Sequence, residues 1–192
     1  MQLSALSGGF GNAAQQSATA FRAIMNVMAR PGMIETLDGA VPPKGLSTAA
    51  GSLLLTLCDP ETKLHLAGDL DSQPIRDWLT FHTGAPFVPA PLADFALGAW
   101  DDLLPLTQYA IGTDQYPDRA ATLIVELPAL TQSGTTLTGP GIKDQAQLSL
   151  PALEPFQSNA ALFPLGCDFF FTSGDKIAAL PRSTKPETPP CM

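Results

Sequence analysis

The sequence predicts an α/β protein, a three-layer α/β/α sandwich around a mixed sheet, and three observations support this. Residues 167–172 (CDFFFT) are apolar almost throughout, which is typical of a strand covered on both faces. Residues 173–175 (SGD) have turn chemistry, and residues 176–180 (KIAAL) return as a partner strand, so we expect a central hairpin. Helical patterns alternate with other short apolar runs along the rest of the chain and should supply the covering layers.

The first predicted helix covers residues 13–29. Asn12 is a suitable N-cap, and Pro31 disfavours α geometry in the residue before it, so the helix should end there. A short strand is expected at 33–37. Apolar residues at helical spacing define the expected inner face of the helix: Ala18, Phe21, Ile24, Met25 and Met28.

A second helix is predicted over residues 47–58, which are apolar nearly all round and should be buried. Residues 63–67 alternate in polarity as a short strand does. A third helix should begin at Asp71 or Ser72, with Pro74 in its first turn, and should end at Gly84. Its expected inner face holds Ile75, Trp78, Leu79 and His82.

The remaining elements are shorter. The clearest is the strand at 120–127 (AATLIVEL), which is again nearly continuous in apolar residues. A segment at 135–138 is expected to pair near that strand, and the tail 185–192, rich in proline, should form an extended arm. Further predicted elements are strands at 87–88, 95–97 and 146–150, a helical turn within 100–106, and a helix at 151–161.

Composition narrows the possible partners. The 192 residues fit one domain, and their net charge of -8, with basic residues scattered singly, makes nucleic acid and anionic membranes poor partners. The start of the chain lacks a basic and an apolar region typical of a signal peptide. Three widely spaced cysteines, Cys58, Cys167 and Cys191, indicate a reduced, cytoplasmic protein.

The sequence holds no convincing catalytic set. His65 and His82 have no metal-ligand partners at close spacing, so no metal site is predicted. Cys167 opens a buried strand beside Asp168, an environment that favours a core cysteine over a nucleophile. Two glycine-rich segments, 8–11 and 139–141, could bind an anion, but ordinary turn geometry explains both more simply.

Arg182 is a candidate for binding an anion. It follows the predicted hairpin directly, and ligands in α/β proteins often lie beyond strand ends. Its guanidinium can hold an anion with two parallel hydrogen bonds. The alternative, which is equally consistent with the sequence, is an ion pair with Asp168 or another carboxylate.

An ordered series of motifs resembles the PhnH family, a subunit of bacterial carbon–phosphorus lyase. The resemblance spans nearly the whole chain and is weakest between residues 98 and 117. Each motif alone is nonspecific, whereas the ordered set is distinctive. The motifs are Phe21-Arg22 with Met28 and Pro31-Gly32, 53–59 (LLLTLCD), 81–86 (FHTGAP), 121–124 (ATLI), 137–142 (LTGPGI), 163–174 (FPLGCDFFFTSG) and 179–184 (ALPRST).

The resemblance implies a fold like the large domain of type I pyridoxal-phosphate-dependent transferases, without the cofactor. It also implies an accessory role in phosphonate catabolism, in which sister subunits and this chain form ribose 1-methylphosphonate 5-triphosphate from ATP and methylphosphonate. The chain lacks the clustered cysteines of an iron–sulfur cluster, in agreement with a cluster on a partner subunit. Within the matched motifs, Arg22, His82 and Arg182 are the candidates for substrate contact.

The expected partners are the other subunits. A homodimer is expected for the isolated chain from the resemblance, together with its few charges and many apolar residues. Two other functions remain open. A true pyridoxal-phosphate enzyme would need a Schiff-base lysine, and none of the five lysines lies in a recognisable cofactor motif. A stand-alone protein that binds a nucleotide or phosphonate is the second alternative.

Overall fold

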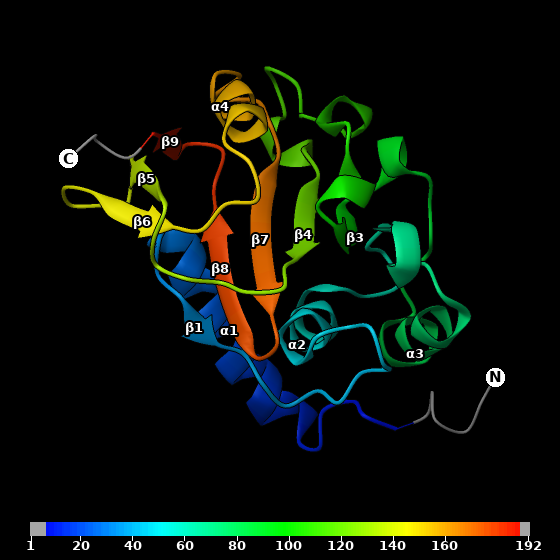
Figure 1. The fold of residues 1–192 in the computed structure, drawn as a ribbon. Helices are drawn as coiled ribbons and strands as arrows, with labels where there is room; N and C mark the ends of the chain where they lie inside the picture. Colours follow the sequence, from blue (N-terminus) through cyan, green and yellow to red (C-terminus); the bar gives the residue numbers. More distant parts are fainter. Residues whose placement is uncertain (1–6, 189–192) are drawn as a thin grey trace.

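The computed structural model describes residues 7–188, which fold around a mixed six-stranded sheet (Figure 1). The strand order across this sheet is β1-β8-β7-β4-β3-β2. Four neighbours, β7, β4, β3 and β2, are parallel, and β8 and β1 continue the sheet in antiparallel pairings. The strands are β1 (Glu35–Thr36), β2 (Leu64–Leu66), β3 (Phe95–Ala99), β4 (Thr122–Glu126), β7 (Asp168–Ser173) and β8 (Lys176–Leu180).

The predicted central hairpin is confirmed as β7 and β8. Phe169 pairs with Leu180 at one end, and Ser173 pairs with Lys176 beside the two-residue turn. Gly174, the first turn residue, has a φ of 60°, a conformation that glycine adopts without strain and that type II′ hairpins require. Phe169, Phe170 and Phe171 are all buried, as expected for a strand covered on both faces.

Helices α1 (Ala13–Ala29), α2 (Thr48–Leu57) and α3 (Gln73–Thr83) cover one face of the sheet. Asn12 caps α1 by accepting a hydrogen bond from the Gln15 backbone, and Ser47 caps α2 in the same way through Ala50. Gly84 ends α3 in the left-handed conformation. The helices enclose a cluster with Ile24, Leu53, Trp78, Ile124 and Phe170 among its members.

The sequence predicts a layer of helices on each face of the sheet. The second face is covered differently. Its cover consists of one short helix, α4 (Glu154–Ala160), several 3₁₀ turns, and a second sheet in the order β6-β5-β9. Phe156 of α4 stacks on Trp100 and packs edge-on against Phe169, so aromatic rings fill this second core. The strands of the small sheet are β5 (Thr135–Thr138), β6 (Ala146–Leu148) and β9 (Lys185–Glu187).

The predicted inner face of α1 is wrong at three residues, Ala18, Phe21 and Met25, which are exposed. Phe21 and Met25 of α1 are each 49% exposed, because the helix buries Ala20, Ala23, Ile24 and Val27 instead. The small inner residues let α1 lie close to α2 and β8. Residues 135–138, which were expected to pair near β4, form β5 of the second sheet and pair with β6 and β9.

The predicted C-terminal arm begins as β9, and residues 189–192 lie outside the described part of the chain. Within residues 7–188, no helix has both the length and the apolar character needed to cross a membrane.

Candidate functional site

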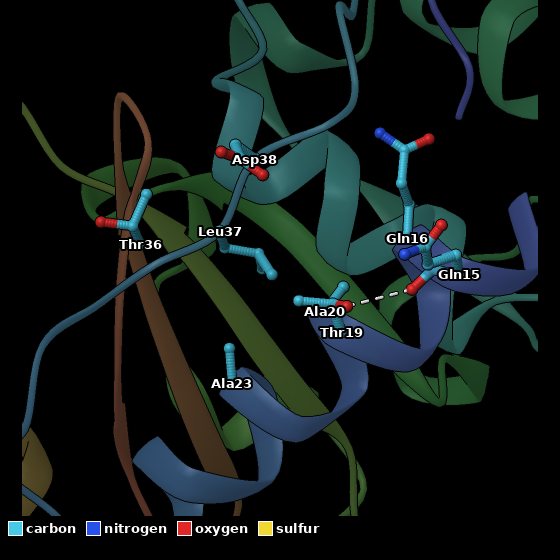
Figure 2. A pocket seen from close by; sticks show the side chains of 8 residues that line it. All are labelled: Gln15, Gln16, Thr19, Ala20, Ala23, Thr36, Leu37 and Asp38. Carbon is cyan, nitrogen blue, oxygen red and sulfur yellow. Dashed lines mark hydrogen bonds between the residues drawn. The ribbon is translucent and has the colours of Figure 1, made fainter. Parts of the chain in front are cut away.

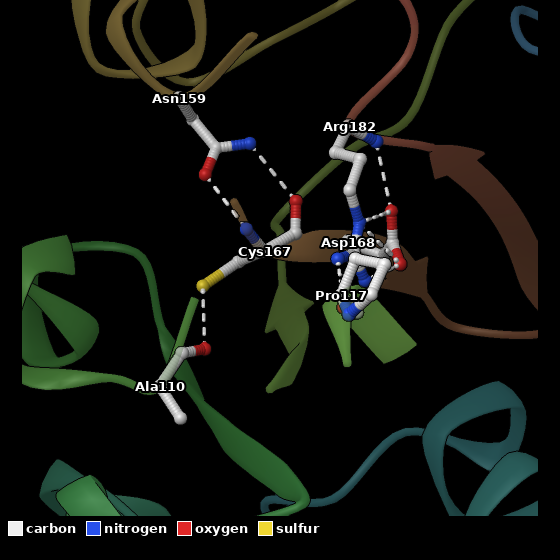
Figure 3. A network of polar contacts seen from close by, with 6 residues as sticks. All are labelled: Ala110, Pro117, Asn159, Cys167, Asp168 and Arg182. Atoms are coloured by element: carbon white, nitrogen blue, oxygen red, sulfur yellow. Dashed lines mark hydrogen bonds and ion pairs between the residues drawn. The ribbon is translucent and has the colours of Figure 1, made fainter. Parts of the chain in front are cut away.

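Arg182 is tied to Asp168 by a network of hydrogen bonds (Figure 3). Its Nε lies 3.1 Å from both carboxylate oxygens, its Nη2 lies 2.5 Å from Oδ2, and its backbone N–H donates to Oδ1 at 2.8 Å. Nη1 also donates to the carbonyl of Pro117 at 2.6 Å. The pair therefore joins the start of β7, the end of β8 and the 117–119 turn, which is the structural alternative foreseen for Arg182.

The position of this pair in the sheet is also informative. Asp168 begins β7, so the pair lies at the amino ends of the parallel strands. Ligands of open α/β sheets bind beyond the carboxyl ends. Arg182 is thus at the opposite edge from the one that this rule favours, and its guanidinium already holds a carboxylate.

Cys167, beside Asp168, is held in the core. Asn159 of α4 accepts a hydrogen bond from the Cys167 backbone N–H at 2.8 Å and donates one to its carbonyl at 2.9 Å. Burial raises the pKa of the Cys167 thiol to about 11, with Arg182 opposing and Asp168 reinforcing the shift. The protonated thiol is a poor nucleophile at neutral pH, in agreement with a core cysteine.

His82 lies at the last turn of α3, next to the glycine-rich segment 8–11. Its Nε2 is 3.3 Å from the carbonyl of Ser7, and its ring packs against Trp78 and Phe81. A Cβ added to Gly9 would lie 2.6 Å from the His82 ring, so this glycine allows a close approach of the backbone. The two segments border an open pocket of about 340 Å³.

Arg22 projects from the exposed side of α1, in the middle of the helix. Among residues 7–188, its side chain takes part in no hydrogen bond or ion pair. The other glycine-rich segment, 139–141, packs near the end of the same helix: a Cβ on Gly141 would lie 2.0 Å from the carbonyl oxygen of Ala29. Close packing and turn geometry explain the glycines of both segments, and this is the simpler of the two interpretations offered by the sequence.

The three candidate residues do not form one site. Across residues 7–188, no hydrogen bond, ion pair or ring contact joins any two of Arg22, His82 and Arg182. They lie on α1, on α3 and after β8, and none of the three pockets described for this chain is lined by two of them.

Glu126 is a half-buried acidic residue that the sequence analysis did not single out. It ends β4 at the carboxyl edge of the parallel strands, where one oxygen accepts from the Ser47 backbone N–H at 2.7 Å. The other oxygen accepts from the Thr172 hydroxyl at 3.0 Å. Burial raises the pKa of Glu126, and the hydrogen bonds from Ser47 and Thr172 partly oppose this. The sequence signal that could have identified Glu126 is an acidic residue at the end of a nearly continuous apolar strand.

Two further pockets lie on different sides of the molecule. A small cavity of about 180 Å³ lies between α1 and the chain that follows β1, and its lining is mostly neutral, including Gln15, Gln16 and Thr19 (Figure 2). An open pocket of about 510 Å³ has two basic and two acidic residues in its lining, Lys63, Arg119, Asp94 and Asp118. Its charges are balanced, so it does not select for anions.

The described residues provide neither a cluster of metal ligands nor a buried lysine for a Schiff base. Within the described range, no group of three or more histidine, cysteine, aspartate or glutamate residues is arranged to hold a metal ion. All five lysines of the chain are exposed: Lys44, Lys63, Lys143, Lys176 and Lys185. None therefore has the buried environment that lowers the pKa of a Schiff-base lysine.

Comparison with known proteins places the chain in a family. Residues 8–187 match the family model described as bacterial phosphonate metabolism protein (PhnH). A protein of Rhizobium meliloti (strain 1021) named alpha-D-ribose 1-methylphosphonate 5-triphosphate synthase subunit PhnH is 39% identical, over 94% of this chain and 95% of that protein. The putative C-P lyase subunit protein HtxG of Stutzerimonas stutzeri is 29% identical, over 89% and 86% respectively. The chain belongs to the PhnH family of bacterial phosphonate metabolism proteins.

Proposed function

We propose that this protein is an accessory subunit of the carbon–phosphorus lyase core complex in phosphonate catabolism. With sister subunits, it is required to form ribose 1-methylphosphonate 5-triphosphate from ATP and methylphosphonate. The observation that carries the proposal is the nearly full-length relation to a subunit named for that synthase. The described residues agree with an accessory role, because Cys167 is protonated and Arg182 is paired with Asp168.

The proposal has three finer parts. The protein acts in the cytoplasm, it forms a homodimer when isolated, and it contributes to a transferase whose catalytic residues lie on other subunits. Its fold is proposed to be related to the large domain of type I pyridoxal-phosphate-dependent transferases. Parallel strands flanked by helices support this relation, while the exposed lysines argue against a cofactor-dependent reaction on this chain.

We also propose Arg22, His82 and Arg182 as candidates for substrate contact, and we order them by the surroundings of each side chain. Arg22 is exposed and its side chain has no hydrogen bond or ion pair among residues 7–188, so its guanidinium is open to phosphate or phosphonate oxygens. Arg182 must share its donors with Asp168. His82 lines a pocket and would act as a hydrogen-bond donor.

Reconstitution tests the proposal directly. The sister subunits are purified with this chain and without it, and adenine release from ATP and methylphosphonate is followed. We expect little or no release in the absence of the chain. Full activity without it would overturn the proposed function.

Two variants then separate substrate contact from structural support. For Arg22→Ala, a complex that assembles but releases adenine slowly, with a raised KM for methylphosphonate, would indicate substrate contact. For Arg182→Ala, we expect a less stable subunit and poor assembly, because Asp168 loses its partner. An assembled Arg182→Ala complex with a raised KM would instead assign Arg182 to the substrate.

A further inference from the structure

The small cavity between α1 and the segment that follows β1 has an apolar floor and a polar rim (Figure 2). The floor consists of Ala20, Ala23 and Leu37, which are all buried. The rim carries two carboxamides and three other polar side chains, from Gln15, Gln16, Thr19, Thr36 and Asp38. An apolar floor inside a polar rim suits a flat ring, whose faces are apolar and whose edge carries hydrogen-bonding atoms.

The α1 side of the rim offers hydrogen-bond donors. The side-chain oxygen of Gln15 accepts from the Asn12 side chain at 3.3 Å, and that of Gln16 accepts from the Asn12 backbone N–H at 2.8 Å. Neither NH₂ group has a hydrogen-bond partner among residues 7–188. Because each oxygen is already engaged at the helix start, each amide presents its NH₂ group as the free end. This side of the rim therefore favours a ligand edge that carries acceptors.

The opposite side of the rim offers an acceptor, the carboxylate of Asp38. This exposed side chain makes no hydrogen bond or ion pair within the described part of the chain. Its backbone is fixed, because the carbonyl of Asp38 accepts from the buried Ser52 hydroxyl at 2.9 Å, and the same hydroxyl accepts from the Ala40 N–H at 3.1 Å. The Leu37 N–H also donates to the carbonyl of Asp175 at 2.7 Å. A carboxylate on a fixed segment can hold a ligand amino group without first ordering a loop.

Size and charge define the class of ligand. The cavity volume of about 180 Å³ is below the range of about 300–1,000 Å³ that is typical of sites for drug-sized molecules, so it matches a single ring system rather than a whole nucleotide. No lysine or arginine lines the cavity, and the one charged side chain is acidic, so phosphate groups are disfavoured there. A neutral ring with an exocyclic amino group is favoured. Adenine has this pattern, an amino donor next to a ring-nitrogen acceptor.

Arg22 lies beside the cavity on the same helix. Gln15, Thr19 and Arg22 are separated by four and three residues, so they share one side of α1. The rise of about 1.5 Å per residue places Arg22 about 4.5 Å beyond Thr19 along the helix axis. Its guanidinium can therefore bind an anionic group that extends out of the cavity, in the way that arginine binds phosphate oxygens.

We infer that this cavity holds the adenine base of ATP, with the triphosphate outside it at Arg22. In this arrangement the Asp38 carboxylate accepts from the amino group of the base, and the NH₂ groups of Gln15 and Gln16 donate to its ring nitrogens. The inference rests on the proposed function for the identity of the ligand, because adenine is the group that the proposed reaction releases. It narrows the two anions proposed for Arg22 to phosphate.

A pair of nucleosides tests the base site on the purified chain. Inosine has an oxygen where adenosine has the amino group, so it would place an acceptor against the Asp38 carboxylate. In calorimetric titrations, we expect the wild-type chain to bind adenosine at least about tenfold more tightly than inosine. Asp38→Asn should remove this preference, because a carboxamide can donate to the inosine oxygen as well as accept from adenosine. Asp118→Asn, at an exposed aspartate in the lining of a different pocket, is the matched control and should keep the preference.

Two results would overturn the base site. One is a wild-type chain that binds neither nucleoside or binds both equally. The other is an Asp38→Asn chain that keeps the preference of the wild type. Thermal melting checks that Asp38→Asn is folded, and we expect a midpoint like that of the wild type because the side chain is exposed and keeps its size.

The position of the triphosphate is tested by comparing ATP with adenosine. The wild-type chain should bind ATP more tightly than adenosine, and Arg22→Ala should reduce this advantage about tenfold, because charge-assisted hydrogen bonds to phosphate are lost. Arg30→Ala is the matched control, at another exposed arginine at the end of the same helix, and should keep the advantage. An Arg22→Ala chain with the full advantage of ATP would overturn the assignment of Arg22.

Adenine release by the reconstituted complex is a separate measurement. A complex that needs this chain, together with a chain that does not bind adenosine, would overturn the cavity assignment and leave the proposed function standing. A chain that binds adenosine with the expected preference, together with a complex that releases adenine fully without it, would overturn the proposed function alone. The two failures are therefore distinguishable.

Discussion

The carboxylate of Glu126, at the end of β4, accepts a hydrogen bond of 2.7 Å from the backbone N–H of Ser47 at the start of α2. Helix N-termini at the carboxyl edge of a parallel sheet are common binding positions for phosphate groups. Here a side chain of the protein itself occupies that position. Glu126 also receives the Thr172 hydroxyl, so one side chain joins α2 to the neighbouring strands β4 and β7.

The first prediction concerns the pH dependence of stability at Glu126. Burial raises its pKa above the ordinary value, so the folded chain binds the proton more tightly than the unfolded chain does. The contribution of Glu126 to stability is therefore complete below the unfolded pKa of about 4.3 and is lost as pH rises through the higher folded pKa. Glu126→Gln should remove this loss. Its free energy of unfolding relative to the wild type should increase between pH 4.5 and pH 7.5.

Urea denaturation at a series of pH values measures this difference. Glu187→Gln, at an exposed residue of β9, is the control and should follow the wild type at every pH. A constant difference between Glu126→Gln and the wild type across the range would contradict the prediction.

The second prediction compares two Asp–Arg pairs. Asp168 and Arg182 have side chains that are only 22% and 13% exposed, whereas Asp71 and Arg76 are 35% and 36% exposed. Removing one member of a buried pair leaves an unpaired charge and costs about 3–5 kcal/mol, while an exposed pair contributes about 0–1 kcal/mol. We expect Asp168→Ala to lower the free energy of unfolding by about 3 kcal/mol and Asp71→Ala by less than about 1 kcal/mol. Equal losses in chemical denaturation would argue against a structural role for the Arg182 pair.

The third prediction concerns the central strand. Phe170 is 4% exposed and packs in the cluster between the sheet and α1–α3. Phe170→Ala should reduce stability by about 3–5 kcal/mol, since the large cavity cannot close. Phe163, which is 60% exposed, is the control, and Phe163→Ala should stay within about 0.5 kcal/mol of the wild type. A Phe170→Ala midpoint close to that of the wild type would show that the strand contributes little to the core.

Local patterns predicted the central hairpin and the positions of the helices because the relevant signals lie within each segment. Continuous apolar residues identify β7, and Asn12, Ser47 and Gly84 mark helix ends through their own side chain or backbone freedom. The inner face of α1 was not predictable in this way. Two sets of apolar residues in α1 recur at helical spacing. The set with the larger side chains, which includes Phe21 and Met25, is the exposed one.

Contacts between distant residues limited the prediction of the site. Glu126 is 79 residues from Ser47 and 46 from Thr172, and no local pattern links them. The pairing of β5 with β9 is of the same kind, because it joins segments on either side of α4 and the central hairpin. For Arg182, the sequence left an anion ligand and an ion pair equally open, and only the fold brings Asp168 against it.

The last prediction tests why the segment 139–141 needs glycine. Gly141 has a φ of 83°, and an added Cβ would lie 2.0 Å from the backbone oxygen of Ala29 at the end of α1. Gly174 has a similar φ of 60°, but a Cβ there would have no atom within 4 Å. Gly174→Ala should therefore cost only the backbone strain of an L-residue, about 1–2 kcal/mol.

Gly141→Ala combines that strain with a clash against main chain, which cannot move without displacing the end of α1. We expect it to lose at least about 2 kcal/mol more than Gly174→Ala, a range typical of overpacking in a rigid environment. Thermal and urea denaturation of the two variants, at equal protein concentration, provide the comparison. If both lost the same stability, α1 would have to yield easily at Ala29, and the tight packing between this turn and the helix end would not be needed for folding.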